Sequence, residues 1–329
     1  MNLINIYTIQ CLIVLIFFYK FKNFSLFVNV FDYPDKRKIH KNPTPLTGGI
    51  FITFNVVFLV FFIYFISGQE PSFNIIFFLF GYISFFSIGF YDDKFKLNAK
   101  LKLLLSILIL FPIVYFDTNV QLKILKFSFI ENSINLEKLS IFITILFFLL
   151  FINAMNMFDG LNCQNGIYSL VLVIVLIGIT NYNIFFLGLL IPVTFFIIYN
   201  YLNKFFLGDN GTLSLGFLFS YFFILQYNRN LINYSDEIYM FMFLPGLDLM
   251  RLYIFRLVNK RNPFKPDRNH IHHYLLESYG YANTILIIFS LIIFPIIINI
   301  YIDKTLLLNF ISLFIYLYLI LFKFKNCFK

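Results

Sequence analysis

Long apolar runs, separated by short polar connections, fill almost the whole chain. A run of about 20 apolar residues can cross the hydrocarbon core of a bilayer as a helix, and polar or turn-forming residues mark where each run ends. The pattern predicts an all-α, polytopic bundle of about eleven transmembrane helices with polar cytoplasmic loops. The expected spans are 3–30, 48–67, 73–91, 102–117, 139–157, 166–182, 184–201, 212–227, 237–257, 282–302 and 305–322. We expect residues 1–329 to form a single membrane domain.

The composition agrees with this class of protein. Hydrophobic residues make up 60% of the 329 positions and charged residues only 12%, whereas a soluble domain carries about 25% charged residues. The three cysteines, Cys11, Cys163 and Cys327, are too few and too scattered for a disulfide framework or a zinc site. Disordered chains, coiled coils and ordinary cytosolic enzymes are therefore excluded.

The basic residues predict how the chain is oriented. A net charge of +9 could indicate nucleic-acid binding, but in a membrane chain a basic excess normally reports topology. If the N-terminus lies outside, 18 of the 25 Lys and Arg residues fall in cytoplasmic connections and 5 in outside connections, while Lys20 and Lys22 make up the remainder. A cleaved signal peptide would place its basic residues before the first apolar run, so we expect an uncleaved first span and a cytoplasmic C-terminus.

Polar motifs gather on the predicted cytoplasmic side. Asp92 and Asp93 are adjacent at the end of one expected span, and Lys100 and Lys102 follow them. Neighbouring carboxylates repel each other unless a cation lies close by, and magnesium often binds through one or two carboxylates together with substrate phosphates. Solvation by water and the nearby lysines is the alternative.

Two further segments have the spacing of a ligand site. Asn153, Asn156 and Asp159 recur every three residues, along one face of a helix, and they form either a polar seam to a neighbouring helix or a hydrogen-bonding wall for a polar ligand. In the Gly208–Thr212 segment, glycines and a helix N-terminus can present backbone N–H groups to phosphate. Asp209 would then hold a metal, although an ordinary turn with a helix cap is the alternative.

The longest cytoplasmic connection contains three of the four histidines, His270, His272 and His273, after Arg268. Zinc is one interpretation, but zinc sites use separated ligands in tetrahedral arrangement and no cysteine supports one here. We favour imidazoles that contact an anionic substrate.

Taken in order, these motifs resemble the polyprenyl-phosphate N-acetylhexosamine-1-phosphate transferases of glycosyltransferase family 4, and in particular the undecaprenyl-phosphate N-acetylglucosaminyl 1-phosphate transferase branch. The resemblance covers residues 32–275. Its motifs are Asp35…Arg37-Lys38-Ile39-His40…Pro43…Gly48-Gly49, Asp92-Asp93, Asn153…Asn156…Asp159-Gly160, Gly208-Asp209…Gly211-Thr212 and Pro266-Asp267-Arg268-Asn269-His270-Ile271-His272-His273.

The chain also departs from the family pattern in two places. Leu46-Thr47 stands where the family often has a basic residue before the glycine pair, and Asn162–Gly166 replaces a second Asp/Asn-Gly-Leu unit. The second departure bears on sugar-nucleotide specificity and on activity itself.

The resemblance implies an activity. The enzyme would transfer a sugar 1-phosphate, with N-acetylglucosamine 1-phosphate as the first choice, from a UDP-sugar to undecaprenyl phosphate and release UMP. This reaction would be the first membrane step of cell-surface polysaccharide synthesis, such as that of O-antigen, in the bacterial cytoplasmic membrane. The expected partners are the UDP-N-acetylhexosamine, the polyprenyl phosphate, membrane lipids and a second copy in a homodimer, with no nucleic acid.

The resemblance also implies residue roles. Asp92, Asp93 and Asp209 are expected to be catalytic and to hold Mg²⁺, for which Mn²⁺ could substitute. The expected substrate-binding residues are Lys36, Arg37, His40, Lys100, Lys102, Asn153, Asn156, Asp159, Arg268, His270, His272 and His273.

Two other functions are kept as alternatives. A transporter would place ionisable residues and broken helices near the bilayer midplane, whereas nearly all acids and histidines here fall at helix ends or in connections. A catalytically inactive family member is favoured only by the departure after Asp159.

Overall fold

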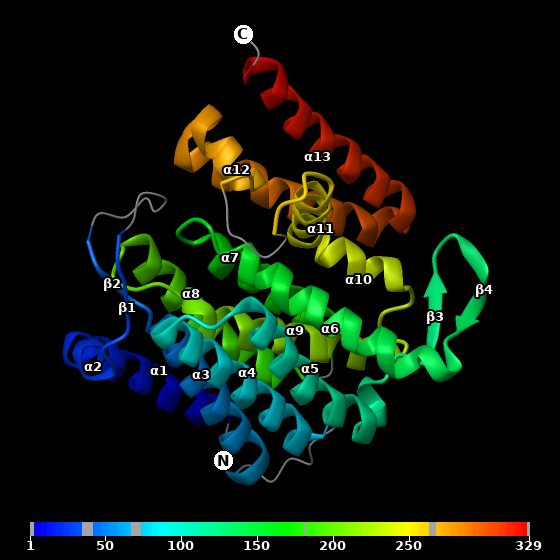
Figure 1. Ribbon diagram of the computed structural model, residues 1–329. Coiled ribbons are helices and arrows are strands. Elements are labelled where there is room, and N and C mark those ends of the chain that lie inside the picture. Colours follow the sequence, from blue (N-terminus) through cyan, green and yellow to red (C-terminus); the bar gives the residue numbers. More distant parts are fainter. Residues whose placement is uncertain (1–2, 35–41, 67–73, 181, 263–267, 328–329) are drawn as a thin grey trace. The chain divides into compact units, whose positions relative to one another are not determined.

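The computed structural model describes residues 3–34, 42–66, 74–180, 182–262 and 268–327 (Figure 1). The expected site residues Lys36, Arg37 and His40 lie outside these ranges. The chain divides into two compact units. Unit 1 comprises Met1–Gln121 and Ile141–Leu231, and unit 2 comprises Leu122–Ser140 and Ile232–Lys329.

Unit 1 is almost entirely helical. Its helices are α1 (Leu3–Tyr19), α2 (Phe21–Val28), α3 (Gly48–Val60) with a π-helical extension (Phe61–Ile66), α4 (Ile75–Phe95), α5 (Ala99–Phe116), α6 (Ser140–Met157), α7 (Gln164–Ile179), α8 (Asn183–Tyr201), α9 (Gly208–Asn228) and a short 3-10 turn (Thr118–Val120). Two short strands, β1 (Phe31–Asp32) and β2 (Thr44–Pro45), pair antiparallel with Phe31 opposite Pro45.

Helix α9 forms the centre of unit 1. Its residues from Asn210 to Tyr227 are all buried, and its most extensive neighbour is α4, followed by α3. Aromatic side chains fill this contact, with the rings of Phe85 and Phe217 stacked at 5.4 Å and Phe78 packed against Phe222 at the same separation. A helix buried on all sides explains why α9 shows no polar face.

Glycines set how closely the helices approach. A Cβ atom at Gly49 in α3 would overlap the backbone of Gly211, and one at Gly89 in α4 would overlap the backbone of Asp209. Any larger residue at these two positions would push the helices apart, so only glycine permits this packing. Both close approaches bring the N-terminal turn of α9 against its neighbours.

Unit 2 combines a hairpin with four helices. Its elements are β3 (Ile124–Phe127), β4 (Ile130–Asn135), a 3-10 turn (Glu137–Leu139), α10 (Ser235–Phe241), α11 (Phe243–Val258), α12 (Ile271–Ile302) and α13 (Thr305–Cys327). The two strands are antiparallel, with Ile124 opposite Asn135. Helix α12 is interrupted at Gly280, which has a φ of +74°, and it packs against α11 and α13.

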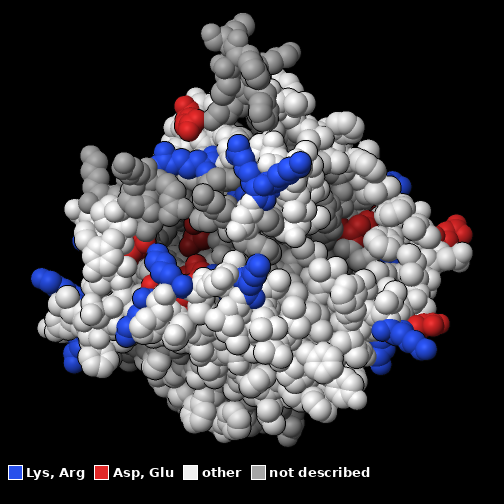
Figure 2. All heavy atoms as spheres, viewed as in Figure 1, with Lys and Arg blue, Asp and Glu red and all other residues white. Residues whose placement is uncertain are grey.

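The all-α, multi-pass membrane class is confirmed. Among the described residues, six helices are long and apolar enough to cross a bilayer, or up to eight if each bent helix pair counts as one span. On the face that Figure 2 shows, most described residues are neither Lys, Arg, Asp nor Glu, and the charged residues form small groups.

The predicted count of eleven spans is not confirmed. The expected spans 3–30 and 237–257 are each broken into two helices, which are bent by 72° at α1/α2 and by 84° at α10/α11. Helix α7 is shorter than a typical span, and the polar start of α9 lowers its hydropathy. A hydropathy pattern counts apolar runs, whereas bends and buried polar turns depend on packing.

Candidate functional site

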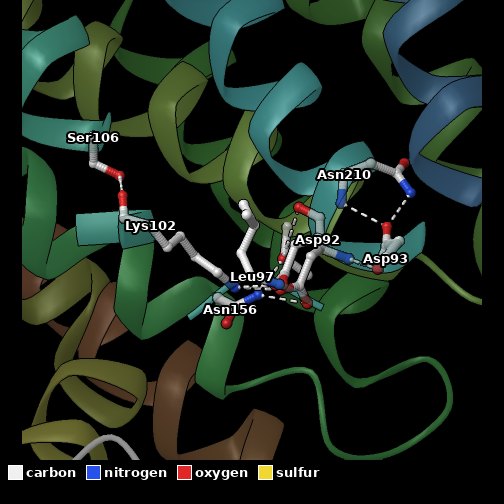
Figure 3. Close-up of polar contacts among 9 residues, drawn as sticks. Asp92, Asp93, Leu97, Lys102, Ser106, Asn156 and Asn210 are labelled. Carbon is white, nitrogen blue, oxygen red and sulfur yellow. Dashed lines mark hydrogen bonds and ion pairs between the residues drawn. The ribbon is translucent and has the colours of Figure 1, made fainter. Parts of the chain in front are cut away.

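Three carboxylates of unit 1, those of Asp92, Asp93 and Asp209, lie where α4 ends and α9 begins (Figure 3). Asp92 and Asp93 lie in the last turn of α4, which ends before Lys96 in a left-handed conformation. Asp209 is the second residue of α9, directly after Gly208 with its φ of +74°. Because Gly89 lets the two helix ends touch, the adjacent Asp92 and Asp93 lie beside Asp209, which comes more than 100 residues later in the chain.

Asp93 anchors the N-terminus of α9. Its carboxylate accepts hydrogen bonds from the backbone N–H of Asp209 (2.9 Å) and Asn210 (3.0 Å) and from the Asn210 side-chain amide (2.5 Å). Backbone N–H groups in the first turn have no partner within the helix, and a carboxylate there also meets the positive end of the helix dipole. Asp93 therefore holds the first turn of α9, which carries Asp209.

Asp92 and Asp209 share a cation. The ammonium group of Lys102, from α5, donates to Asp209 Oδ2 at 2.5 Å and forms an ion pair with Asp92 Oδ2. The three side chains are 12–31% exposed, so the group can be reached from solvent. The backbone N–H of Leu97 donates to the other oxygen of Asp92. One positive group thus lies between carboxylates of two helices.

Asn156 fixes the other side of Asp209. Its side-chain amide donates to Asp209 Oδ1 at 3.0 Å and to the hydroxyl of Thr212 at 2.8 Å. Asn153, three residues earlier, instead donates to the backbone carbonyl of Leu149 in its own helix. Of the two asparagines predicted to share a face, only Asn156 reaches the carboxylate cluster.

The ionisation of two carboxyl groups reflects this surrounding. Desolvation by the protein raises the pKa of Asp209, but the charge of Lys102 and the hydrogen bond from Asn156 outweigh it and lower the pKa to about 2. Asp159 is exposed at the surface, yet desolvation by the surrounding protein and the negative charges of Asp209 and Asp93 raise its pKa to about 7. Asp209 is therefore an anion at neutral pH, whereas Asp159 titrates there.

The remaining predicted residues of unit 1 lie less centrally. Lys100 is exposed two residues before Lys102, and its backbone N–H donates to the side chain of Asn98. Its side chain lies on the surface, so the structure separates the two lysines that the sequence treated alike.

The histidine segment of unit 2 forms its own cluster. His270 Nδ1 is 2.8 Å from Asp248 Oδ2, and its ring stacks on that of His272 with centroids 5.2 Å apart. His272 is 1% exposed and its Nδ1 has no hydrogen-bond partner among the described residues. The ring of His273 lies next to that of His272, with centroids 4.4 Å apart. Arg268 is exposed.

The donor chemistry fits a hard divalent cation better than zinc. Among the described residues, no three His, Cys, Asp or Glu side chains converge in a ready metal site. Magnesium does not need such a site, since it often binds through one or two carboxylates and completes its shell with water and phosphate. Asp92 and Asp209, which already hold the ammonium of Lys102 between them, provide such a pair.

Some residues that shape these clusters were not predicted. Asn210 donates to both Asp93 and the carbonyl of Leu46, and Tyr316 donates to Asp248 at 2.8 Å from α13. The position of Asn210 beside Asp209 was a usable signal. Tyr316 is one tyrosine among 22, and nothing in its surrounding sequence marks it.

The fold is that of a multi-pass membrane protein, and an acidic, lysine-bridged cluster lies at its helix ends. The model of the family described as "Glycosyl transferase family 4" matches residues 75–227, which include Asp92, Asp93, Asn156 and Asp209. The chain is similar to this family over those residues, and the similarity supports a transferase.

Curated relatives agree with the family. An undecaprenyl-phosphate alpha-N-acetylglucosaminyl 1-phosphate transferase of Thermotoga maritima is 29% identical, over 79% of this chain and 77% of the relative. A probable undecaprenyl-phosphate N-acetylglucosaminyl 1-phosphate transferase of Bacillus subtilis is 27% identical, over 78% and 72%. The Escherichia coli K12 transferase of the same name as the first is 25% identical, over 76% and 70%.

Proposed function

We propose that this protein transfers N-acetylglucosamine 1-phosphate from UDP-N-acetylglucosamine to undecaprenyl phosphate. The lipid phosphate oxygen forms a bond to the sugar-bearing phosphorus, the bond to the UMP oxygen breaks, and UMP leaves. The product is a lipid-linked sugar diphosphate that can start a cell-surface polysaccharide. The names of the relatives support undecaprenyl phosphate as the acceptor and N-acetylglucosamine 1-phosphate as the transferred group. The bacterial origin of those relatives supports the cytoplasmic membrane as the location.

The observation that carries this proposal is the cation position between Asp92 and Asp209. Two anionic substrates must meet for this reaction, and their phosphates repel each other. A site in which two carboxylates lie around one positive group suits diphosphate chemistry, in which positioning and electrostatic stabilisation are the main catalytic tasks. A transporter has no need for such a cluster at the end of α4.

Asp92 and Asp209 would hold Mg²⁺, or Mn²⁺ in its place, together with phosphate oxygens of the donor. When bound, the metal would neutralise the charge that develops on the leaving UMP. Two residues keep Asp209 in place. Asn156 donates a hydrogen bond to the carboxylate of Asp209, and Asp93 accepts one from the backbone N–H of Asp209. With the metal bound, the ammonium of Lys102 would be free to pair with the substrate phosphates.

The acceptor needs little activation. The second pKa of a phosphate monoester lies near 6, so undecaprenyl phosphate is already largely a dianion at neutral pH. A direct attack therefore suffices. A covalent intermediate would instead require a carboxylate to act as nucleophile beside other negative groups.

The remaining predicted residues keep their proposed roles. Asn156 and Asp159 would contact the nucleotide, and Arg268, His270, His272 and His273 of unit 2 would contact phosphate or sugar. The orientation with the N-terminus outside and the carboxylates in the cytoplasm, where UDP-sugars are made, is part of the same proposal.

A transfer assay with purified protein tests the proposal. UDP-[¹⁴C]N-acetylglucosamine, undecaprenyl phosphate and Mg²⁺ should give one UMP per labelled, organic-extractable lipid. Replacing the donor by UDP-N-acetylgalactosamine tests the choice of sugar. A folded protein that forms no labelled lipid from any UDP-N-acetylhexosamine would contradict the proposal and favour an inactive family member.

A further inference from the structure

A buried aspartate in unit 2, Asp248 of α11, is outside every role assigned so far. It is 3% exposed, and a carboxylate this deeply buried is costly unless charged and polar groups surround it. Asp248 Oδ1 accepts hydrogen bonds from Arg251 Nη2 (2.7 Å), Tyr316 Oη (2.8 Å) and the backbone N–H of Ile271 (3.3 Å). Asp248 Oδ2 faces His270 Nδ1 at 2.8 Å.

These contacts hold one carboxylate from several directions. Arg251 lies one turn further along α11, Tyr316 comes from α13, and Ile271 opens α12 directly after His270. Arg251 also donates from Nε to Tyr316 at 2.6 Å and from Nη2 to the carbonyl of Asn269. Arg251, Tyr316 and the backbone of Ile271 thus fix the carboxylate of Asp248 independently of the His270 side chain.

The fixed carboxylate determines the state of the imidazole. An ionised carboxylate only accepts hydrogen bonds, so His270 Nδ1 must carry a proton. The other ring nitrogen, Nε2, has no hydrogen bond among the described residues and is not fully enclosed. A carboxylate behind a histidine orients the ring and fixes which nitrogen carries the proton, and in a doubly protonated ring Nε2 is a donor as well.

We propose that Asp248 is a positioning residue that holds His270 with Nδ1 protonated, so that Nε2 is presented to a phosphate group of the substrate. The proposal rests on the proposed function for the identity of that phosphate. Arg251 and Tyr316 support the carboxylate, and they leave its second oxygen to His270. Asp248 itself touches no substrate.

A double-mutant cycle tests this assignment. Asp248→Asn keeps the shape of the side chain but removes its charge, and we expect a loss of kcat/KM of about 10- to 100-fold, as for a carboxylate removed from behind a metal-bound histidine. In a His270→Gln background, Asp248→Asn should lower kcat/KM little further, because either change alone already disables the Asp248–His270 pair. Losses that simply multiply would overturn the proposal.

Asp236 provides a matched control. It is another buried aspartate of unit 2, in α10, and it accepts hydrogen bonds from the backbone and hydroxyl of Ser128 at 2.9 and 2.5 Å. Asp236→Asn should act independently of His270→Gln, so the two effects should multiply. Coupling of both aspartates to His270 would indicate general destabilisation and contradict a specific role for Asp248.

A spectroscopic reading separates this proposal from the proposed function. In ¹⁵N-histidine-labelled protein without substrate, with the His270 signals identified by their loss in His270→Gln, Nδ1 should be protonated in the native chain. Asp248→Asn should change the ring nitrogen shifts of His270, and Asp236→Asn should not. An unprotonated Nδ1 in the native protein would overturn the proposal whatever the enzyme transfers.

Discussion

At the residue scale, three aspartates that look equivalent in sequence have different surroundings. Asp93 accepts hydrogen bonds from the backbone of α9, whereas Asp92 and Asp209 share the ammonium of Lys102. The adjacency of Asp92 and Asp93 predicted a carboxylate site, and it could not predict which carboxylate would cap a helix more than 100 residues away, since that depends on the packing of α4 against α9.

Lys102 gives a prediction about metal binding. Replacing Lys102 by Met removes the ammonium that competes for Asp92 and Asp209, so Mn²⁺ should bind at least about tenfold more tightly, which corresponds to roughly 1.4 kcal/mol of lost competition. Titration of Mn²⁺ by electron paramagnetic resonance measures this directly. Lys94→Met is the control, because Lys94 is exposed and lies near the ring of Phe95, and its affinity should remain that of the native chain.

Asp159 gives a prediction about pH. Because its pKa is raised to about 7, the carboxyl group gains a proton as the pH falls below 7. If the ionised form contacts the nucleotide, kcat/KM should decrease on the acid side of pH 7. Asp159→Asn should lower activity above pH 7 and flatten this limb. An unchanged acid limb in the variant would assign the titration to another group.

At the element scale, the site depends on how closely helices approach. Gly49, Gly89 and Gly208 place the N-terminal turn of α9 against α3 and α4, and the backbone N–H groups of Gly48 and Gly49 donate to the carbonyls of Phe206 and Leu207. The sequence predicted these segments as motifs because Gly-Gly and Gly-Asp stand out among apolar residues. The bends at α1/α2 and α10/α11 have no such signal, and they account for part of the difference in the span count.

Gly89 gives the corresponding prediction. A Cβ atom at this position would overlap the backbone of Asp209, so Gly89→Ala must push α9 away from α4. We expect a loss of stability of about 1–3 kcal/mol and a transfer rate that falls more steeply than the folded fraction. Thermal unfolding and the transfer assay together measure both effects.

Gly178 is the matched control for this substitution. It lies in α7, and a Cβ atom there would have nothing within 4 Å. Gly178→Ala should leave activity unchanged and stabilise the helix slightly. Equal losses in the two variants would show that close approach at Gly89 does not position the site.

At the scale of the whole molecule, composition and charge were the most informative features. The low content of charged residues predicted the membrane class, and the ordered motifs predicted the resemblance to the family, because both depend on sequence alone and not on packing. The residues around Asp248 were harder to predict, because Arg251 and Tyr316 meet it only through the packing of α11 and α13. The single-domain expectation and the orientation of the chain stay predictions.

The orientation can be tested with single cysteines. Cysteines introduced at Lys94 and Lys204 should react with a membrane-impermeant maleimide only after the membrane is opened, whereas cysteines at Glu131 and Lys138 should react in intact cells. The native chain, with its own cysteines, gives the background labelling. Labelling of the cysteine at position 94 in intact cells would put Asp92 and Asp209 outside, where no cytoplasmic UDP-sugar reaches them.

The most direct test of the central claim is the dependence of transfer on a divalent cation at Asp92 and Asp209. UMP release should require Mg²⁺ or Mn²⁺, stop in excess chelator and return when the metal is restored. Asp209→Asn should lose at least about 100-fold in rate while the protein still inserts and folds, because one carboxylate of the pair is gone. Full turnover in excess chelator, or an Asp209→Asn variant as active as the native enzyme, would contradict the account.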